Sequence, residues 1–264
     1  MAIGQIINDR RSARRTDGGG AGRNEDMLGV LLSMADDPNS EYVLTDKTEM
    51  YAAGTDTSST VIEWAMAEMI MNPRIMRRVQ EEIDVQVGKN RLVGVEDLPH
   101  LPLVVATLKE TLRLHPVAPL LVPRQSEEAC QIDGNNIPAK TNAVINAWRI
   151  HRDPSVWEEP LRFWPDRFLD PAKVDLHAKR LEFLPFGAGH RICAGLHLAN
   201  VITQLSLASL LHCFHWEGPP SPEGSKAGLD MSETYHLTMA MSCPLTAKAT
   251  PRLPVDVLAS MLEV

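Results

Sequence analysis

Apolar residues predict helices along four stretches of the chain, and the first three stretches end at a helix-stopping residue. The first stretch starts at a capping box formed by Asp46 and Glu49 and ends before Pro73, and Gly88 closes the second. A short apolar run over 27–34 predicts one further helix. The four main predicted helices cover residues 46–71, 74–87, 103–115 and 196–212.

The segments between these helices have other patterns. Residues 117–148 hold short alternating stretches that predict strands and turns, and the tail around Leu237–Met241 predicts a β-hairpin. Residues 149–190 are rich in Pro, Asp and Trp, which favours long ordered loops. Residues 8–26 are polar and glycine-rich, so we expect an exposed linker there, with a basic targeting signal as the alternative. The pattern as a whole predicts a mainly α fold with small β-sheets.

Composition narrows the classes of function. The chain has 264 residues, enough for one or two domains, and its net charge of −8 makes it a poor candidate for binding nucleic acid. Its four cysteines lie far apart without a CxxC pair, which argues against a disulfide scaffold or a zinc knuckle. We find no signal peptide and expect no membrane anchor, because no run approaches 18 uncharged apolar residues.

One glycine-rich stretch carries the strongest chemical signal. Residues 186–195 read FGAGHRICAG and deliver Cys193 to the start of the predicted helix over 196–212. The free N–H groups and dipole of a helix start stabilise a thiolate, and glycines let the backbone approach a flat, bulky group. A lone cysteine is more often a small buried hydrophobe. Here six positions match a haem-thiolate signature: Phe186, Gly187, Gly189, Arg191, Cys193 and Gly195.

These residues give the chain a clear resemblance to the C-terminal, haem-binding half of a cytochrome P450. The sequences of these motifs are similar to those of plant members that hydroxylate flavonoids and phenylpropanoids. The resemblance implies a flexible segment over 1–26 and a partial P450 domain over 27–264, which runs from the distal helix to the tail. It also implies that haem (iron protoporphyrin IX) is the cofactor, with Cys193 as the ligand of its iron. Arg124 and Arg191 match positions that pair with haem propionates in the family.

Two further motifs come in the order that the family has. Glu110 and Arg113 stand three residues apart on one predicted helix face, where they can form a charge-assisted bond. Such a pair alone is common on protein surfaces. Pro165-Asp166-Arg167-Phe168 resembles the family element whose arginine joins that pair. The resemblance therefore implies a structural network of Glu110, Arg113 and Arg167 behind the haem.

The third motif is Ala53-Gly54-Thr55-Asp56-Thr57-Ser58, which resembles the oxygen-binding kink of the family's long distal helix. Gly54 removes a side chain where a ligand must approach. Asp56 and Thr57 place a carboxylate beside a hydroxyl, a pair suited to passing protons during oxygen activation. The alternative is a Ser/Thr-rich turn with local bonds from side chains to the backbone.

We therefore expect a monooxygenase that inserts one atom of O2 into a small apolar or aromatic substrate. Its electrons would come from NADPH through a flavoprotein, NADPH–cytochrome P450 reductase, as the resemblance implies. Full-length family members act at the cytosolic face of the endoplasmic reticulum membrane, whereas this chain as written lacks the anchor and a cytoplasmic location is the alternative. Two other hypotheses are a truncated, inactive haem-binding remnant and an acidic interaction protein without haem.

Overall fold

The computed structural model describes residues 52–170, 181–220, 228–235 and 238–259. The chain forms two compact units, Met1–Asp56 and Thr57–Val264. The described part of the first unit is a five-residue π-helix, η1 (Ala52–Asp56). The linker over 8–26, the helix over 27–34 and the capping box at Asp46 all lie outside the described residues. The elements that follow belong to the second unit.

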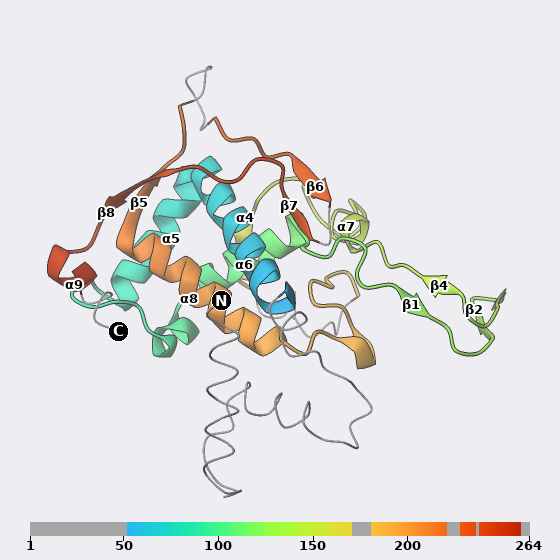
Figure 1. Ribbon diagram of the computed structural model, residues 1–264. Helices are drawn as coiled ribbons and strands as arrows, with labels where there is room; N and C mark the ends of the chain where they lie inside the picture. Colours follow the sequence, from blue (N-terminus) through green and yellow to red (C-terminus); the bar gives the residue numbers. More distant parts are fainter. Residues whose placement is uncertain (1–51, 171–180, 221–227, 236–237, 260–264) are drawn as a thin grey trace, which may run out of the picture. The chain divides into compact units, whose positions relative to one another are not determined.

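Four long helices form the centre of the second unit (Figure 1). Three of them lie close to their predicted bounds, whereas α4 begins at Thr57, eleven residues after the predicted start at Asp46. α4 packs against the other three, and α8 packs against α5 and α6 as well. α4 ends at the predicted residue, and α5 ends just before Gly88, whose positive φ of 79° suits glycine. The helices are α4 (Thr57–Met71), α5 (Pro73–Gln86), α6 (Pro102–Leu114) and α8 (Leu196–Cys213).

Prolines fix where two of these helices begin. Pro73 and Pro102 stand in the first turn of α5 and α6, where a missing N–H removes no helical hydrogen bond. α5 buries a single face, with Val79 and Ile83 fully covered. α4 carries apolar residues around most of its circumference and buries Trp64 completely. The amphipathic helix therefore lies at the edge of the core, and α4 lies within it.

The described strands pair into four two-stranded antiparallel sheets. The predicted turn at Asp133-Gly134 connects β2 to β3, and both residues have positive φ, as a type I′ hairpin turn requires. The tail hairpin is also present, although residues 236 and 237 lie outside the described part. The pairs are β1 (Arg124–Gln125) with β4 (Asn142–Ala143), β2 (Cys130–Ile132) with β3 (Asn135–Ile137), β5 (Phe214–Glu217) with β8 (Lys248–Pro251), and β6 (Glu233–Tyr235) with β7 (Met239–Met241).

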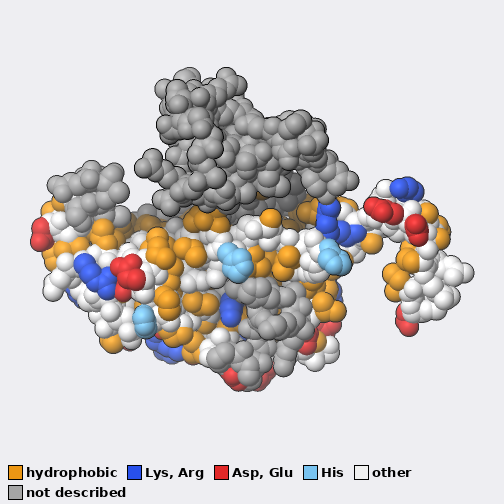
Figure 2. Space-filling view, turned by 90° about the horizontal axis from the view of Figure 1, so that it is seen from below, with side chains coloured by type: hydrophobic (Ala, Val, Ile, Leu, Met, Phe, Trp, Pro, Cys, Tyr) orange, Lys and Arg blue, Asp and Glu red, His pale blue; other side chains and the backbone are white. Residues whose placement is uncertain are grey.

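The first two sheets form an arm that projects from the helices, at the right of Figures 1 and 2. The side chains of β2 are all exposed, so the arm has little core of its own. The expected loop region over 149–190 holds only short elements among its described residues. The remaining elements are η2 (Val95–His100), α7 (Ala147–Ile150), η3 (Pro165–Phe168), η4 (Gly189–Arg191) and α9 (Val255–Ala259).

Helix α8 corrects one expectation from the sequence. By length and composition it could cross a membrane, with a mean hydropathy of 1.2, and it is the one helix in the described part of the chain that passes this test. The statement that no run approaches a membrane span is therefore wrong for Leu196–Cys213. The helix contacts α4, α5 and α6, and its Leu207 and Leu211 are fully buried in the core. A core helix of a folded domain meets the same criterion.

Candidate haem-binding site

The cysteine loop, residues 186–195, ends at the first turn of α8. Gly187 and Gly189 have φ values of +74° and +69°, a left-handed backbone that side chains other than glycine disfavour. The Cys193 N–H donates to the Phe186 carbonyl at 3.0 Å, which folds the loop back on itself. Cys193 is exposed. The two glycines and this bond therefore hold an accessible thiol beside the N-terminal end of an 18-residue helix.

The space beside the thiol is open because of a glycine. A Cβ built on Gly195 would lie 3.8 Å from the Cys193 sulfur, in van der Waals contact with it. Any other residue at position 195 would therefore place a side chain against the sulfur. Glycine at this position leaves that side of Sγ free for a large planar group.

Arg124 and Arg191, the two arginines expected to pair with haem propionates, both lie at the cysteine loop. Arg124, the first residue of β1, donates from Nη2 to the backbone carbonyl of Arg191 at 3.2 Å. The Arg191 side chain is itself exposed. A Cβ on Gly187 would lie 3.8 Å from Arg124 Nη2, so the arginine passes close to the loop backbone. The base of the arm thus brings a second cation to the loop that carries the cysteine.

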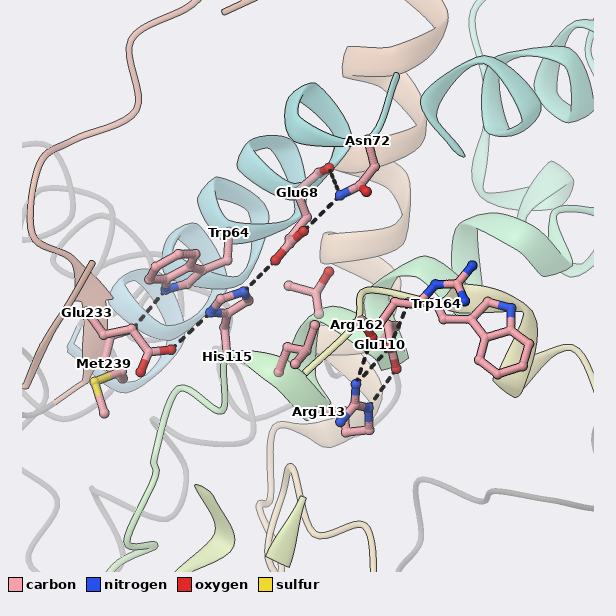
Figure 3. A network of polar contacts seen from close by, with 12 residues as sticks. Trp64, Glu68, Asn72, Glu110, Arg113, His115, Arg162, Trp164, Glu233 and Met239 are labelled. Atoms are coloured by element: carbon pink, nitrogen blue, oxygen red, sulfur yellow. Dashed lines mark hydrogen bonds and ion pairs between the residues drawn. The ribbon is translucent and has the colours of Figure 1, made fainter. Parts of the chain in front are cut away.

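The structure brings the side chains of Glu110, Arg113 and Arg167 together (Figure 3 shows the first two). Arg113 meets the Glu110 carboxylate with two parallel bonds of 2.8 Å, and both side chains are completely buried. Arg167, from η3, donates to Glu110 Oε1 at 3.2 Å. The attraction within a buried bidentate pair offsets part of the free energy needed to remove two charges from water.

Arg113 also organises the backbone around it. Its Nη1 donates to the carbonyls of His151 at 2.8 Å and Pro160 at 2.7 Å, and the Trp164 N–H donates to Glu110 at 2.8 Å. These bonds fix a segment with few regular elements to the buried end of α6. The pair therefore satisfies polar groups that an irregular loop would otherwise leave unpaired.

The motif over residues 53–58, called the distal motif below, contains the division between the two units, which falls after Asp56. η1 contains Gly54 and Asp56 in a π-helical turn, a rare conformation that is frequent at functional sites. Asp56 is exposed, and Thr57 begins α4 in the second unit. The expected kink thus coincides with a change in helix type along the chain.

A buried polar cluster that the sequence did not predict lies between α4, the end of α6 and β6. His115 contacts Glu68 Oε1 at 2.9 Å through Nε2 and Glu233 Oε1 at 3.0 Å through Nδ1 (Figure 3). Arg152 contacts the same oxygen of Glu233 at 3.3 Å. A histidine directly after a helix is a weak signal, and its partners are distant in sequence, so only the fold reveals the cluster.

Electrostatics reinforce this cluster. Burial alone would lower the pKa of His115, but the hydrogen bonds to Glu233 and Glu68 outweigh it and the pKa is raised. Burial would likewise raise the pKa of Glu233, yet the bonds from His115 and Trp148 and the charge of Arg152 lower it. The cluster is therefore a set of charged partners that stabilise one another. Among the described residues, no group of three His, Cys, Asp or Glu side chains is arranged to hold a metal ion.

Comparisons with known sequences agree with this geometry. The family model described as Cytochrome P450 matches residues 2–233. Flavonoid 3',5'-hydroxylase 2 of Petunia hybrida is 42% identical over 243 residues, 89% of this chain and 47% of that protein. Flavonoid 3'-monooxygenase of Petunia hybrida is 43% identical over 245 residues, 88% and 47% of the two chains. The chain therefore spans about half the length of these relatives.

A solved structure agrees as well. A zebra fish cytochrome P450 with abiraterone superposes with a TM-score of 0.77 at 30% identity, over 94% of this chain and 58% of that chain. The resemblance and the fold class inferred from the sequence are thereby confirmed. With a family model that matches most of its length and a fold that solved members share, the chain belongs to the cytochrome P450 family.

Proposed function

We propose that this chain is the haem-binding part of a monooxygenase that inserts one atom of O2 into a small phenolic substrate of the flavonoid class. The observation that carries the proposal is the exposed thiol of Cys193 at the start of α8, within a glycine loop to which Arg124 is bonded. The substrate class rests on relatives named as flavonoid 3'- and 3',5'-hydroxylases.

The residues of the cysteine loop fit a haem group. The exposed thiol of Cys193 would supply the sulfur ligand, and Gly195 leaves one side of that sulfur open. Arg124 and Arg191 supply two cations for carboxylate groups, and arginine suits this role because its planar guanidinium can bond a carboxylate through two N–H groups. When bound, haem supplies the iron at which O2 is reduced and one oxygen atom is passed to the substrate.

The chain's own residues prepare this site before any ligand binds. Cys193 lies three residues before the first residue of α8, and the N-terminal end of a helix is a place where free N–H groups and the dipole favour a negatively charged ligand. We propose that Arg124 and Arg191 hold the haem propionates and thereby fix the orientation of the ring. The network of Glu110, Arg113 and Arg167 has a structural part in this proposal, because its buried charges fix the loops that precede the cysteine loop.

The distal motif has the second chemical task in the proposal. The Thr57 hydroxyl would hold a proton where oxygen is reduced, and the Asp56 carboxylate, exposed to solvent, would resupply it. Monooxygenation consumes two electrons, which we propose arrive from NADPH through NADPH–cytochrome P450 reductase. The proposed place of action is the cytosolic face of the endoplasmic reticulum membrane, with the cytoplasm as the alternative for this chain.

A cysteine series tests the proposal. In the haem-loaded protein, reduction under carbon monoxide should give the red-shifted Soret band from which the family takes its name. Cys193→Ala should abolish this band. Cys130→Ala is the matched control, because Cys130 is also exposed but lies in β2 of the arm, and its loss should leave the band unchanged. An unchanged band in Cys193→Ala would overturn the ligand assignment.

A further inference from the structure

His151 is a fully buried histidine for which the proposed function has no task. It follows α7 directly and is 0% exposed. Its Nε2 accepts a hydrogen bond of 2.8 Å from the backbone N–H of Leu184. Leu184 lies two residues before the cysteine loop, so the imidazole holds the segment from which that loop starts.

The imidazole is a permanent acceptor in this position. Burial, followed by the positive charges of Arg113 and Arg152, lowers the pKa of His151 to about 3. A neutral imidazole carries one N–H and one lone pair. Because Nε2 accepts from Leu184, the proton lies on Nδ1. At neutral pH the imidazole is therefore uncharged, and its Nε2 can accept the bond from Leu184.

The backbone of the same residue is bound to the buried charge pair. The His151 carbonyl accepts a bond of 2.8 Å from Arg113 Nη1, and Arg113 is paired with Glu110. The ring of Phe183 packs against the imidazole with the two ring centroids 5.3 Å apart. The backbone carbonyl of His151 is therefore held by the charge pair, while its ring nitrogen holds the Leu184 N–H.

The hydrogen bonds continue from Leu184 to the cysteine. The Gly187 N–H donates to the Leu184 carbonyl at 3.1 Å, and the Cys193 N–H donates to the Phe186 carbonyl at 3.0 Å. Gly187 and Gly189 adopt their left-handed conformation inside this stretch. A shift of Leu184 would therefore move the turn that sets the position of Cys193.

We infer that His151 is a positioning residue that connects the buried Glu110–Arg113 pair to the cysteine loop and holds the Cys193 thiol in place. The role assigned to Cys193 rests on the proposed function, whereas the control of loop position does not. A residue without an acceptor at this point would leave the buried Leu184 N–H unpaired, which natural interiors avoid.

Amide hydrogen exchange of the 264-residue chain without haem tests the inference directly. His151→Phe keeps a buried ring but removes the acceptor, and exchange over residues 183–193 should become faster by about one order of magnitude or more. His151→Gln supplies a side-chain oxygen that can accept from Leu184, so it should restore much of the protection.

His212→Phe is the matched control. His212 is also fully buried, but its Nε2 contacts the Gly88 carbonyl at 2.7 Å, at the far end of α8. This variant also removes the hydrogen bond of a buried histidine, yet exchange over 183–193 should follow only its overall stability. Equal protection of 183–193 in the parent chain and His151→Phe would overturn the inference, as would equal losses in His151→Phe and His212→Phe.

A second readout separates this inference from the proposed function. In the haem-loaded protein, His151→Phe should convert part of the thiolate-type Soret band of the carbon monoxide complex to the unshifted form, and His151→Gln should convert less. If Cys193→Ala leaves that band unchanged, the proposed function fails while the exchange result still decides the role of His151. If exchange is unaffected by His151→Phe, the positioning role fails while the ligand assignment stands.

Discussion

The imidazole of His115 lies flat against the indole of Trp64, with ring centroids 3.9 Å apart and planes inclined by 3°. The indole N–H in turn donates to the Met239 carbonyl at 3.0 Å (Figure 3). The Met239 N–H donates to the Val117 carbonyl at 2.9 Å. The stack therefore connects α4 to β7 and to the chain that follows α6.

The charge state of His115 gives the first prediction. Both ring nitrogens contact carboxylate oxygens, an arrangement that favours the imidazolium with two N–H donors. Its pKa is raised, so the stability it contributes is complete below the ordinary histidine pKa of about 6.5 and is lost as pH rises through the raised value. The free energy of unfolding lost in His115→Phe should therefore shrink as pH rises above neutrality.

Urea unfolding at a series of pH values between about 6 and 9 measures this difference. Glu233 contributes the opposite pH dependence. Because its pKa is lowered, the stability that it contributes is complete above the ordinary glutamate pKa and is lost as pH falls through the lowered value. Arg152 faces Glu233 and stays charged across this range, with a pKa of about 10. A loss in His115→Phe that is constant with pH would show that only packing against Trp64 matters.

The second prediction concerns the buried charge pair. Arg113→Ala would leave the Glu110 carboxylate buried without its partner and should lower the free energy of unfolding by about 3–5 kcal/mol. Arg78→Ala is the control, because the exposed pair of Arg78 with Asp166 also has two short bonds, of 2.5 and 2.9 Å. Solvent screens that pair, so its loss should cost at most about 1 kcal/mol. Similar losses in the two variants would contradict the structural role of Arg113.

Two glycines with almost the same backbone give the third prediction. Gly187 has φ +74° in the cysteine loop, and Gly134 has φ +75° in the arm turn. Alanine at either position should destabilise the protein by about 1–2 kcal/mol through backbone strain. Only Gly187→Ala should also weaken the binding of haem, measured by titration, because its Cβ would lie near Arg124. Equal haem affinity in both variants would show that the loop tolerates the side chain.

The sequence predicted the parts of the molecule whose signals are local. Helix α5 follows from its apolar spacing and from Gly88, and the loop before α8 follows from a dense motif around Cys193. β5 pairs with β8 and places Phe214 opposite Pro251, but the alternation of apolar and polar residues in β5 does not identify its partner strand. Pairing between distant segments depends on how helices pack, which local patterns do not record.

The same limit applies to the polar groups. Glu110 and Arg113 are three residues apart on α6, so their pairing could be predicted from helix geometry. His115 and Glu233 are 118 positions apart, and nothing local distinguishes either from a surface residue. His151 drew no functional prediction because its partner is a backbone N–H, which every residue except proline has. Buried contacts of this kind appear only once the fold is known.

The last prediction tests the proton-passing role proposed for Thr57. In the haem-loaded enzyme, protons that reach the wrong oxygen release peroxide instead of product, so the hydroxyl should govern how efficiently NADPH is used. Thr57→Ala should lower the product formed per NADPH more than it lowers NADPH consumption, with peroxide making up the difference. Thr57→Ser keeps the hydroxyl and should restore much of the coupling.

Ser58→Ala provides the matched control, because it removes the next hydroxyl along α4 from a buried side chain about 100° around the helix. Its coupling should remain close to that of the parent enzyme, measured as product, peroxide and NADPH in the same reaction. If Thr57→Ala is as well coupled as Ser58→Ala, the hydroxyl passes no proton. Gly54 and the π-helical turn before α4 would then be a structural kink without a chemical task.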